Sequence, residues 1–123
     1  MKIEVSNGEI IDKLTILEIK LEKIDDPEKR RNIRKEYDLL SEAAAAILPK
    51  EDPLYRQLKE VNLRLWEIED RIRELERRKD FGEAFIETAR SVYRENDRRA
   101  ALKREINERT GSSLTEEKSY KPY

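Results

Sequence analysis

The stretch that decides the fold runs from residue 54 to residue 75 and reads LYRQLKEVNLRLWEIEDRIREL. Its apolar residues recur at alternating intervals of four and three positions, at Leu54, Leu58, Val61, Leu65, Ile68, Ile72 and Leu75. In a helix this heptad spacing gathers the apolar side chains into one narrow stripe, and polar residues cover the other faces. The stretch therefore predicts a long helix with a coiled-coil-like seam.

Residues typical of helix starts predict two helices before this one and mark where the long helix begins. Ser6 followed by Glu9 has the pattern of a capping box, so a first helix is expected to begin about Asn7. Asp26-Pro27 and Asp52-Pro53 each place an N-cap residue before a proline at the first helical position. The second helix is therefore expected to begin at residue 27, and the long helix at residue 53.

The remaining helix ends are marked in the same way. Pro49 stops the second helix. Asp80 and Glu83 form a second capping-box pattern, so Asp80 is expected to cap a fourth helix. That helix extends to Thr110, and Gly111 is expected to terminate it, because glycine readily adopts the left-handed conformation found after helices.

Together these signals define an all-α fold. We expect an antiparallel helical bundle of about four helices with coiled-coil-like heptad seams, in which the third and fourth helices form a long hairpin. Residues 1–111 form a single helical domain, and residues 112–123 form an irregular C-terminal tail. The long hairpin extends past the two shorter helices, so part of its seam lacks a partner within one chain. A homodimer through this overhang is expected.

Composition narrows the classes of function. Charged residues make up 45% of the chain, yet the 27 basic and 28 acidic residues nearly cancel, so no nucleic-acid partner is expected. The absence of Cys and His excludes disulfides, thiolate or imidazole metal sites and Ser-His-Asp triads. No segment resembles a signal peptide or membrane span, so we expect a cytoplasmic protein without a membrane partner. High charge and scarce amides also predict a thermostable protein.

Polar residues interrupt the apolar stripe of the fourth helix. That stripe begins with Phe85, Ala89 and Val92 and then becomes polar and cationic. Other polar side chains stand beside the seam of the third helix and on the rear apolar face of the first. Buried charges are costly unless they are paired, so these residues either pair with one another or line a cleft. The candidate ligand-binding residues are Asp12, Asn62, Glu69, Asn96, Asp97, Arg99, Lys103 and Asn107.

Two interpretations of this cluster stay open at this point. In the structural one, Asn96 sets the register of the bundle, and Arg99 and Lys103 either extend to solvent at the bundle edge or pair with Asp12 or Glu69. Alternatively within this interpretation, the fourth helix leaves the bundle by residue 96, and its far half is solvated. In the other, the cluster forms an interhelical cleft for an anionic, phosphate-bearing ligand.

A magnesium-dependent version of that cleft would use carboxylates one helical turn apart. The candidate pairs are Glu9 with Asp12 and Glu67 with Asp70. Among 28 acidic residues such spacings also arise by chance, so no metal and no cofactor is expected.

Four stretches of the chain form a distinctive set, namely NGEIIDKLTILEIK at 7–20, NLRLWEIED at 62–70, ARSVYRENDRRAALKREIN at 89–107 and EEKSY at 116–120. Together they resemble a family of small uncharacterised helical proteins of bacteria and their phages. The resemblance covers nearly the whole chain. It implies no activity, because the family is one of unknown function. All the candidate residues lie within these stretches.

No catalytic signature is present. The sequence therefore predicts a non-enzymatic helical interaction or scaffold module that acts as a homo-oligomer with a protein partner. The alternative is a small enzyme or ligand-binding protein that uses the interhelical polar cleft.

Overall fold

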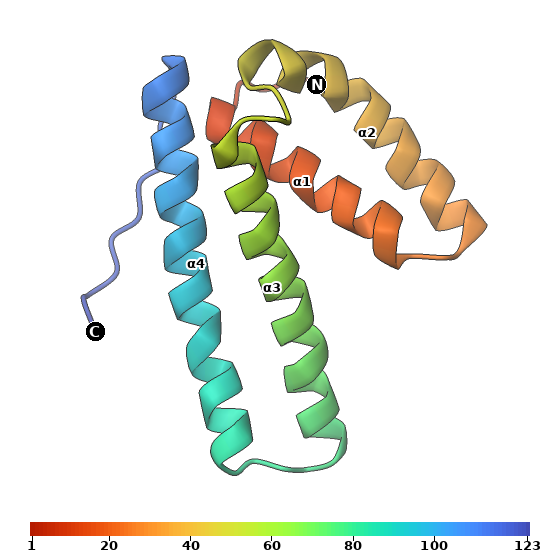
Figure 1. Cartoon of the computed structure of the whole chain (residues 1–123), viewed down its shortest axis with the longest axis vertical. Coiled ribbons are helices and arrows are strands. Elements are labelled where there is room, and N and C mark those ends of the chain that lie inside the picture. The colour runs from red at the N-terminus through yellow and green to blue at the C-terminus, as the bar shows by residue number, and fades with distance from the viewer.

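The computed structural model describes all of residues 1–123 and contains four helices and no strand. The helices are α1 (Asn7–Lys23), α2 (Pro27–Ile47), α3 (Pro53–Arg77) and α4 (Glu83–Thr110). The long helices α3 and α4 form an antiparallel hairpin, and α1 and α2 form a shorter hairpin against one end of it (Figure 1). The predicted all-α fold and the long hairpin are confirmed. None of the helices combines the length and apolarity that a membrane crossing requires.

The N-terminal caps follow the sequence in three helices of four. The side chain of Ser6 accepts a hydrogen bond from a backbone N–H in the first turn of α1, and Asp26 and Asp52 do the same for α2 and α3. The prediction that Asp80 caps α4 is wrong. Its Oδ1 accepts a hydrogen bond from the N–H of Gly82 at 3.2 Å, which closes a turn, and the helix begins only after that turn without a side-chain cap.

The core forms where α1 crosses the long hairpin. α1 packs against all three other helices, as expected for a helix that is apolar on two faces. The core cluster draws on every helix and consists of Ile11, Leu14, Ala44, Leu48, Leu54, Tyr55, Leu58 and Ile106. We call the part of the hairpin that α1 covers, residues 53–64 and 96–110, the proximal half. Residues 65–95, including the connecting turn, form the distal half.

The distal half extends past α1 and α2 (Figure 1). Of its seam residues on α3, Leu75 is fully buried, whereas Leu65, Ile68 and Ile72 are only half-buried. Ala89 was predicted to lie in the core of α4, but it is exposed. The heptad spacing brings these residues to one side of each helix, but no third helix covers that side.

The C-terminal tail returns along the outside of α4 (Figure 1). α4 ends at Thr110, and Gly111 adopts a left-handed conformation with a φ of 65°, as predicted. Glu117 then pairs with Arg104 at 2.8 Å, and the ring of Tyr123 stacks on that of Tyr93 with 4.9 Å between centroids. The tail is therefore irregular but docked.

Candidate functional site

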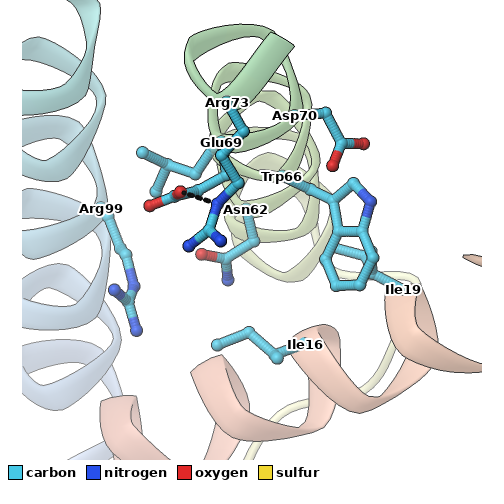
Figure 2. A pocket seen from close by; sticks show the side chains of 9 residues that line it. Ile16, Ile19, Asn62, Trp66, Glu69, Asp70, Arg73 and Arg99 are labelled. Carbon is cyan, nitrogen blue, oxygen red and sulfur yellow. Dashed lines mark hydrogen bonds and ion pairs between the residues drawn. The ribbon is translucent and has the colours of Figure 1, made fainter. Parts of the chain in front are cut away.

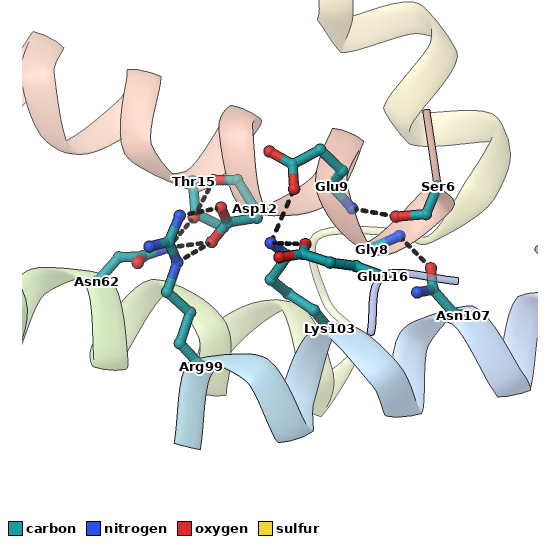
Figure 3. A network of polar contacts seen from close by, with 10 residues as sticks. All are labelled: Ser6, Gly8, Glu9, Asp12, Thr15, Asn62, Arg99, Lys103, Asn107 and Glu116. Atoms are coloured by element: carbon teal, nitrogen blue, oxygen red, sulfur yellow. Dashed lines mark hydrogen bonds and ion pairs between the residues drawn. The ribbon is translucent and has the colours of Figure 1, made fainter. Parts of the chain in front are cut away.

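A buried carboxylate ties three helices together at one point (Figure 3). Asp12 on α1 is 1% exposed and accepts hydrogen bonds from Nε and Nη2 of Arg99 on α4, at 2.9 and 2.5 Å. Nδ2 of Asn62 on α3 donates to the same carboxylate at 2.9 Å and to the hydroxyl of Thr15 at 2.8 Å. The hydrogen bonds to Asp12 raise the pKa of Arg99. The pairing compensates the cost of burying the charge.

A second ion cluster lies one turn further along α4. The Nζ of Lys103 donates to Glu9 of α1 at 2.7 Å and to Glu116 of the tail at 2.8 Å (Figure 3). Burial alone would lower the pKa of Lys103, but the hydrogen bonds to the two carboxylates outweigh it and raise the pKa. The same contact lowers the pKa of Glu116. One lysine thus joins α1, α4 and the tail.

The first turn of α1 approaches the backbone of α4 very closely. The N–H of Gly8 donates to Oδ1 of Asn107 at 2.6 Å. A Cβ atom placed on Gly8 would lie 2.5 Å from the carbonyl oxygen of Lys103, closer than any side chain permits. Glycine is therefore required here for the approach of two helices, and this approach brings Asp12 and Glu9 within reach of α4.

The structure brings together five of the eight candidate residues. Asp12, Asn62 and Arg99 form the buried carboxylate network, and Lys103 and Asn107 contact the first turn of α1 beside it.

The other three candidates lie outside this network. Glu69 is exposed and pairs with Arg73 at 3.2 Å. Asn96 is half-buried, and its side chain makes no hydrogen bond. Asp97 is exposed and accepts a hydrogen bond from the hydroxyl of Tyr123, which raises the pKa of that tyrosine.

The observed pairings favour the structural interpretation of the network. The predicted pairing of Arg99 with Asp12 is confirmed, and Lys103 is neutralised by two carboxylates. Both cations that could have held a phosphate are therefore already paired. Glu9 and Asp12 each face a cation, and no group of three or more acidic residues converges where a metal ion could bind.

Beside the network, the corner between α1 and the hairpin holds an open groove of about 460 Å³ (Figure 2). Arg99 and Asn62 belong both to the network and to the lining of the groove. The complete lining consists of Ile16, Ile19, Asn62, Leu65, Trp66, Glu69, Asp70, Arg73 and Arg99. The groove is thus one of the places where the polar network meets solvent.

Four residues of the network were absent from the sequence-based ligand-binding candidates, namely Gly8, Glu9, Thr15 and Glu116. Glu9 was considered only as a partner of Asp12 in a magnesium site. Gly8 carried a usable signal, because a glycine inside the first turn of a helix often marks a close backbone approach. Thr15 offered a weaker one, as a polar residue on a helix that is apolar on two faces. Glu116 begins the EEKSY stretch that resembles the family, but nothing in that stretch indicates that it contacts Lys103 of α4.

Fold and site together define a small all-α protein of two hairpins, joined by a buried network of ion pairs and hydrogen bonds across α1, α3 and α4. The chain matches a family of unknown function (DUF6165) over residues 1–123 and belongs to that family. This confirms the resemblance at the level of a family of unknown function. No curated protein and no solved structure matches the chain.

Proposed function

We propose that the protein is a non-enzymatic helical interaction module that acts as a homodimer. The observation that carries the proposal is its large surface. The chain exposes 8,764 Å², whereas a folded monomer of 14.7 kDa is expected to expose about 6,900 Å². The extended arm and tail account for part of the excess of about 1,800 Å². Each partner buries about 800 Å² in a standard protein–protein interface, so the excess exposed area is large enough to form one such interface.

The distal half supplies the surface that a second copy would cover. Its apolar residues are mostly half-buried or exposed, with Phe81 at 54% and Ile86 at 53%. We call this set the distal face: Leu65, Ile68, Ile72, Phe81, Phe85, Ile86 and Val92. Two such hairpins related by a two-fold axis would form a four-helix bundle and extend the heptad seam as an intermolecular coiled coil.

Charge on the distal half is compatible with self-association. Its ion pairs carry both signs, with Arg73 against Glu69 at 3.2 Å and Arg90 against Glu87 at 2.7 Å. Two copies of a surface of mixed sign can approach without the like-charge repulsion that a single-sign face would produce. The charges of the distal half therefore allow it to pack against the distal half of a second copy of the chain.

Light scattering of a concentration series tests the dimer. The wild-type chain is expected to reach twice the monomer mass. Ile86→Glu places a charge on the distal face at a position already exposed to solvent, so it is expected to remain folded and monomeric. Leu39→Glu is the matched control, because Leu39 on α2 is 74% exposed and lies outside the distal face. A monomer mass for the wild type at the highest concentration would contradict the proposal.

The setting of the module is also part of the proposal. We propose a cytoplasmic, thermostable protein of bacterial or phage origin. The support is its composition, in which 45% of residues are charged and nearly balanced in sign, as in heat-adapted proteins with many surface ion pairs. A thermal unfolding midpoint of about 50 °C, ordinary for mesophilic domains, would contradict heat adaptation.

A further inference from the structure

The groove contains one buried side chain with an unused hydrogen-bonding atom. Asn62 is only 6% exposed, and its Nδ2 is fully engaged by Asp12 and Thr15. Its Oδ1 accepts no hydrogen bond. Every fully buried polar side-chain atom of the protein has a hydrogen-bond partner, so this oxygen has to be accessible to solvent. Asn62 lines the groove and lies between Arg99 and Trp66 (Figure 2). The groove therefore contains a hydrogen-bond acceptor, Oδ1 of Asn62, that is fixed in position and has no donor within the protein.

The orientation of this amide follows from its partner. Asp12 is a carboxylate paired with an arginine, so it can only accept hydrogen bonds. The amide group that faces it must be the NH₂ group, which turns the carbonyl oxygen of Asn62 away from Asp12. The same network that buries Asp12 thereby presents an acceptor to the groove.

Arg99 places hydrogen-bond donors next to this acceptor. Its Nε and the Nδ2 of Asn62 bind the same oxygen of Asp12, each at 2.9 Å, so the two side chains lie side by side. Arg99 uses Nε and Nη2 on Asp12, and the N–H groups of Nη1 have no partner. Asp12 thus holds the guanidinium in place. The Nη1 group of Arg99 is a free donor, and the Oδ1 of Asn62 beside it is a free acceptor at one end of the groove.

The rest of the groove favours a flat, uncharged molecule. Its apolar wall consists of Ile16, Ile19, Leu65 and Trp66, and the indole of Trp66 offers an aromatic face (Figure 2). The charged residues of the groove are balanced, with Glu69 and Asp70 against Arg73 and Arg99. Both arginines are already paired with carboxylates, which disfavours phosphate, and the apolar wall disfavours a sugar. A volume of about 460 Å³ lies within the range of sites for small molecules.

We propose that this groove binds an uncharged planar heterocycle that carries a hydrogen-bond donor next to an acceptor, as the base of a free nucleoside does. Asn62 accepts from the heterocycle, Arg99 donates to it, and Trp66 stacks on its face. Asparagine and arginine side chains pair with base edges in this manner, and aromatic side chains stack on bases. The groove and the distal face share one residue, Leu65, so the binding test needs a control variant outside both surfaces.

Tryptophan fluorescence tests the site directly, because Trp66 is the single tryptophan of the chain. The full-length protein is titrated separately with adenosine, guanosine, cytidine and uridine, and with ribose and inorganic phosphate as probes of the sugar and anion alternatives. At least one nucleoside is expected to quench the fluorescence saturably at up to millimolar concentration, and ribose and phosphate are not. No quenching by any nucleoside would overturn the proposal, and so would equal quenching by ribose or phosphate.

Two variants separate binding from folding. Ile16→Glu fills the groove from α1 without removing a member of the Asp12 network, and it is expected to weaken nucleoside binding by about tenfold or more. Trp66→Ala, measured by calorimetry because it removes the fluorophore, is expected to weaken binding by a similar factor. Leu39→Glu, which changes neither the groove nor the distal face, is the control and should bind as the wild type does. Unchanged binding in both groove variants would also overturn the proposal.

Discussion

The proximal and distal halves of the α3–α4 hairpin share one heptad spacing, but they differ in everything that depends on a third helix. In the proximal half α1 covers the seam, and the charged residues at the crossing are buried and paired, with Asp12 of α1 at 1% and Lys103 of α4 at 7% exposure. In the distal half most apolar residues are half-buried or exposed, and the pair of Glu69 and Arg73 stands in solvent with side chains 63% and 73% exposed. Removing an ion pair is therefore expected to lower the free energy of unfolding in the proximal half and to leave it almost unchanged in the distal half.

The largest expected effect comes from removing the buried carboxylate. Asp12→Ala leaves Arg99 without its counterion and Asn62 without its acceptor. Removing one partner of a buried ion pair costs about 3–5 kcal/mol, and the partial exposure of Arg99, 29% of its side chain, places the expected loss at the lower end. Urea unfolding measures it as the change in the free energy of unfolding.

The matched distal variant is Glu69→Gln. It removes one charge from an exposed pair, so the expected change is less than about 0.5 kcal/mol. Similar losses in Asp12→Ala and Glu69→Gln would show that the two halves do not differ in the way their burial indicates.

A smaller effect is expected from adding a single methyl group at Gly8. Alanine normally favours a helix over glycine, but its Cβ would lie 2.5 Å from the carbonyl oxygen of Lys103, which is backbone and cannot move aside freely. Gly8→Ala is therefore expected to destabilise the protein by about 1–3 kcal/mol, as overpacking does. Thermal unfolding checks this prediction.

Gly82 in the distal turn is the control for Gly8. A Cβ there would meet only Oδ1 of Asp80, a side-chain atom at 3.4 Å, and the φ of Gly82 is −80°. Gly82→Ala should leave the midpoint nearly unchanged. A stabilised Gly8→Ala variant would mean that α1 does not approach α4 as closely as described.

The smallest of the three effects on stability comes from Glu18 and depends on pH. Glu18 of α1 accepts hydrogen bonds from Tyr55 at 2.5 Å and Lys50 at 2.7 Å. Burial alone would raise the pKa of Glu18, but hydrogen bonds from Lys50, Tyr55 and Lys59 outweigh it and lower the pKa below 4.5. A depressed pKa adds stability above pH 4.5 that is lost as the pH falls through the folded-state pKa. Glu18→Gln is expected to lose about 1 kcal/mol at neutral pH and to flatten this acid dependence.

Glu74 provides the distal comparison for this titration. A hydrogen bond from Arg77 lowers its pKa as well, but the Glu74 side chain is 45% exposed, against 15% for Glu18. Because salt screens exposed pairs far more than buried ones, Glu74→Gln should alter the acid dependence only at low ionic strength. Unfolding curves between pH 6 and pH 3, recorded at low and high salt, distinguish the two. Loss of the Glu18 effect at high salt would argue against its burial.

Most of the fold followed from the sequence, but the polar site did so only in part. Arg99, Lys103 and Asn62 were identified because they break an apolar pattern, and buried polar residues have to find partners. Asn96 breaks the same pattern, yet its side chain bonds to nothing. The apolar spacing of α4 shows which of its residues point toward the rest of the bundle. It does not show how far along α4 the covering helix α1 extends.

The sequence by itself determined the helices, their seams and three of their four N-terminal caps. These features depend on residues within one or two turns of each other, and on local signals such as Asp26-Pro27 or the glycine after Thr110. Only the tertiary structure decided that Asp12 meets Arg99, that Gly8 touches the backbone of Lys103 and that Glu116 folds back onto α4. Such pairs depend on where α1 crosses the long hairpin and at what angle, and that crossing is set by the packing of the whole core. The distal half therefore keeps its apolar seam, although the chain itself leaves that seam half-covered.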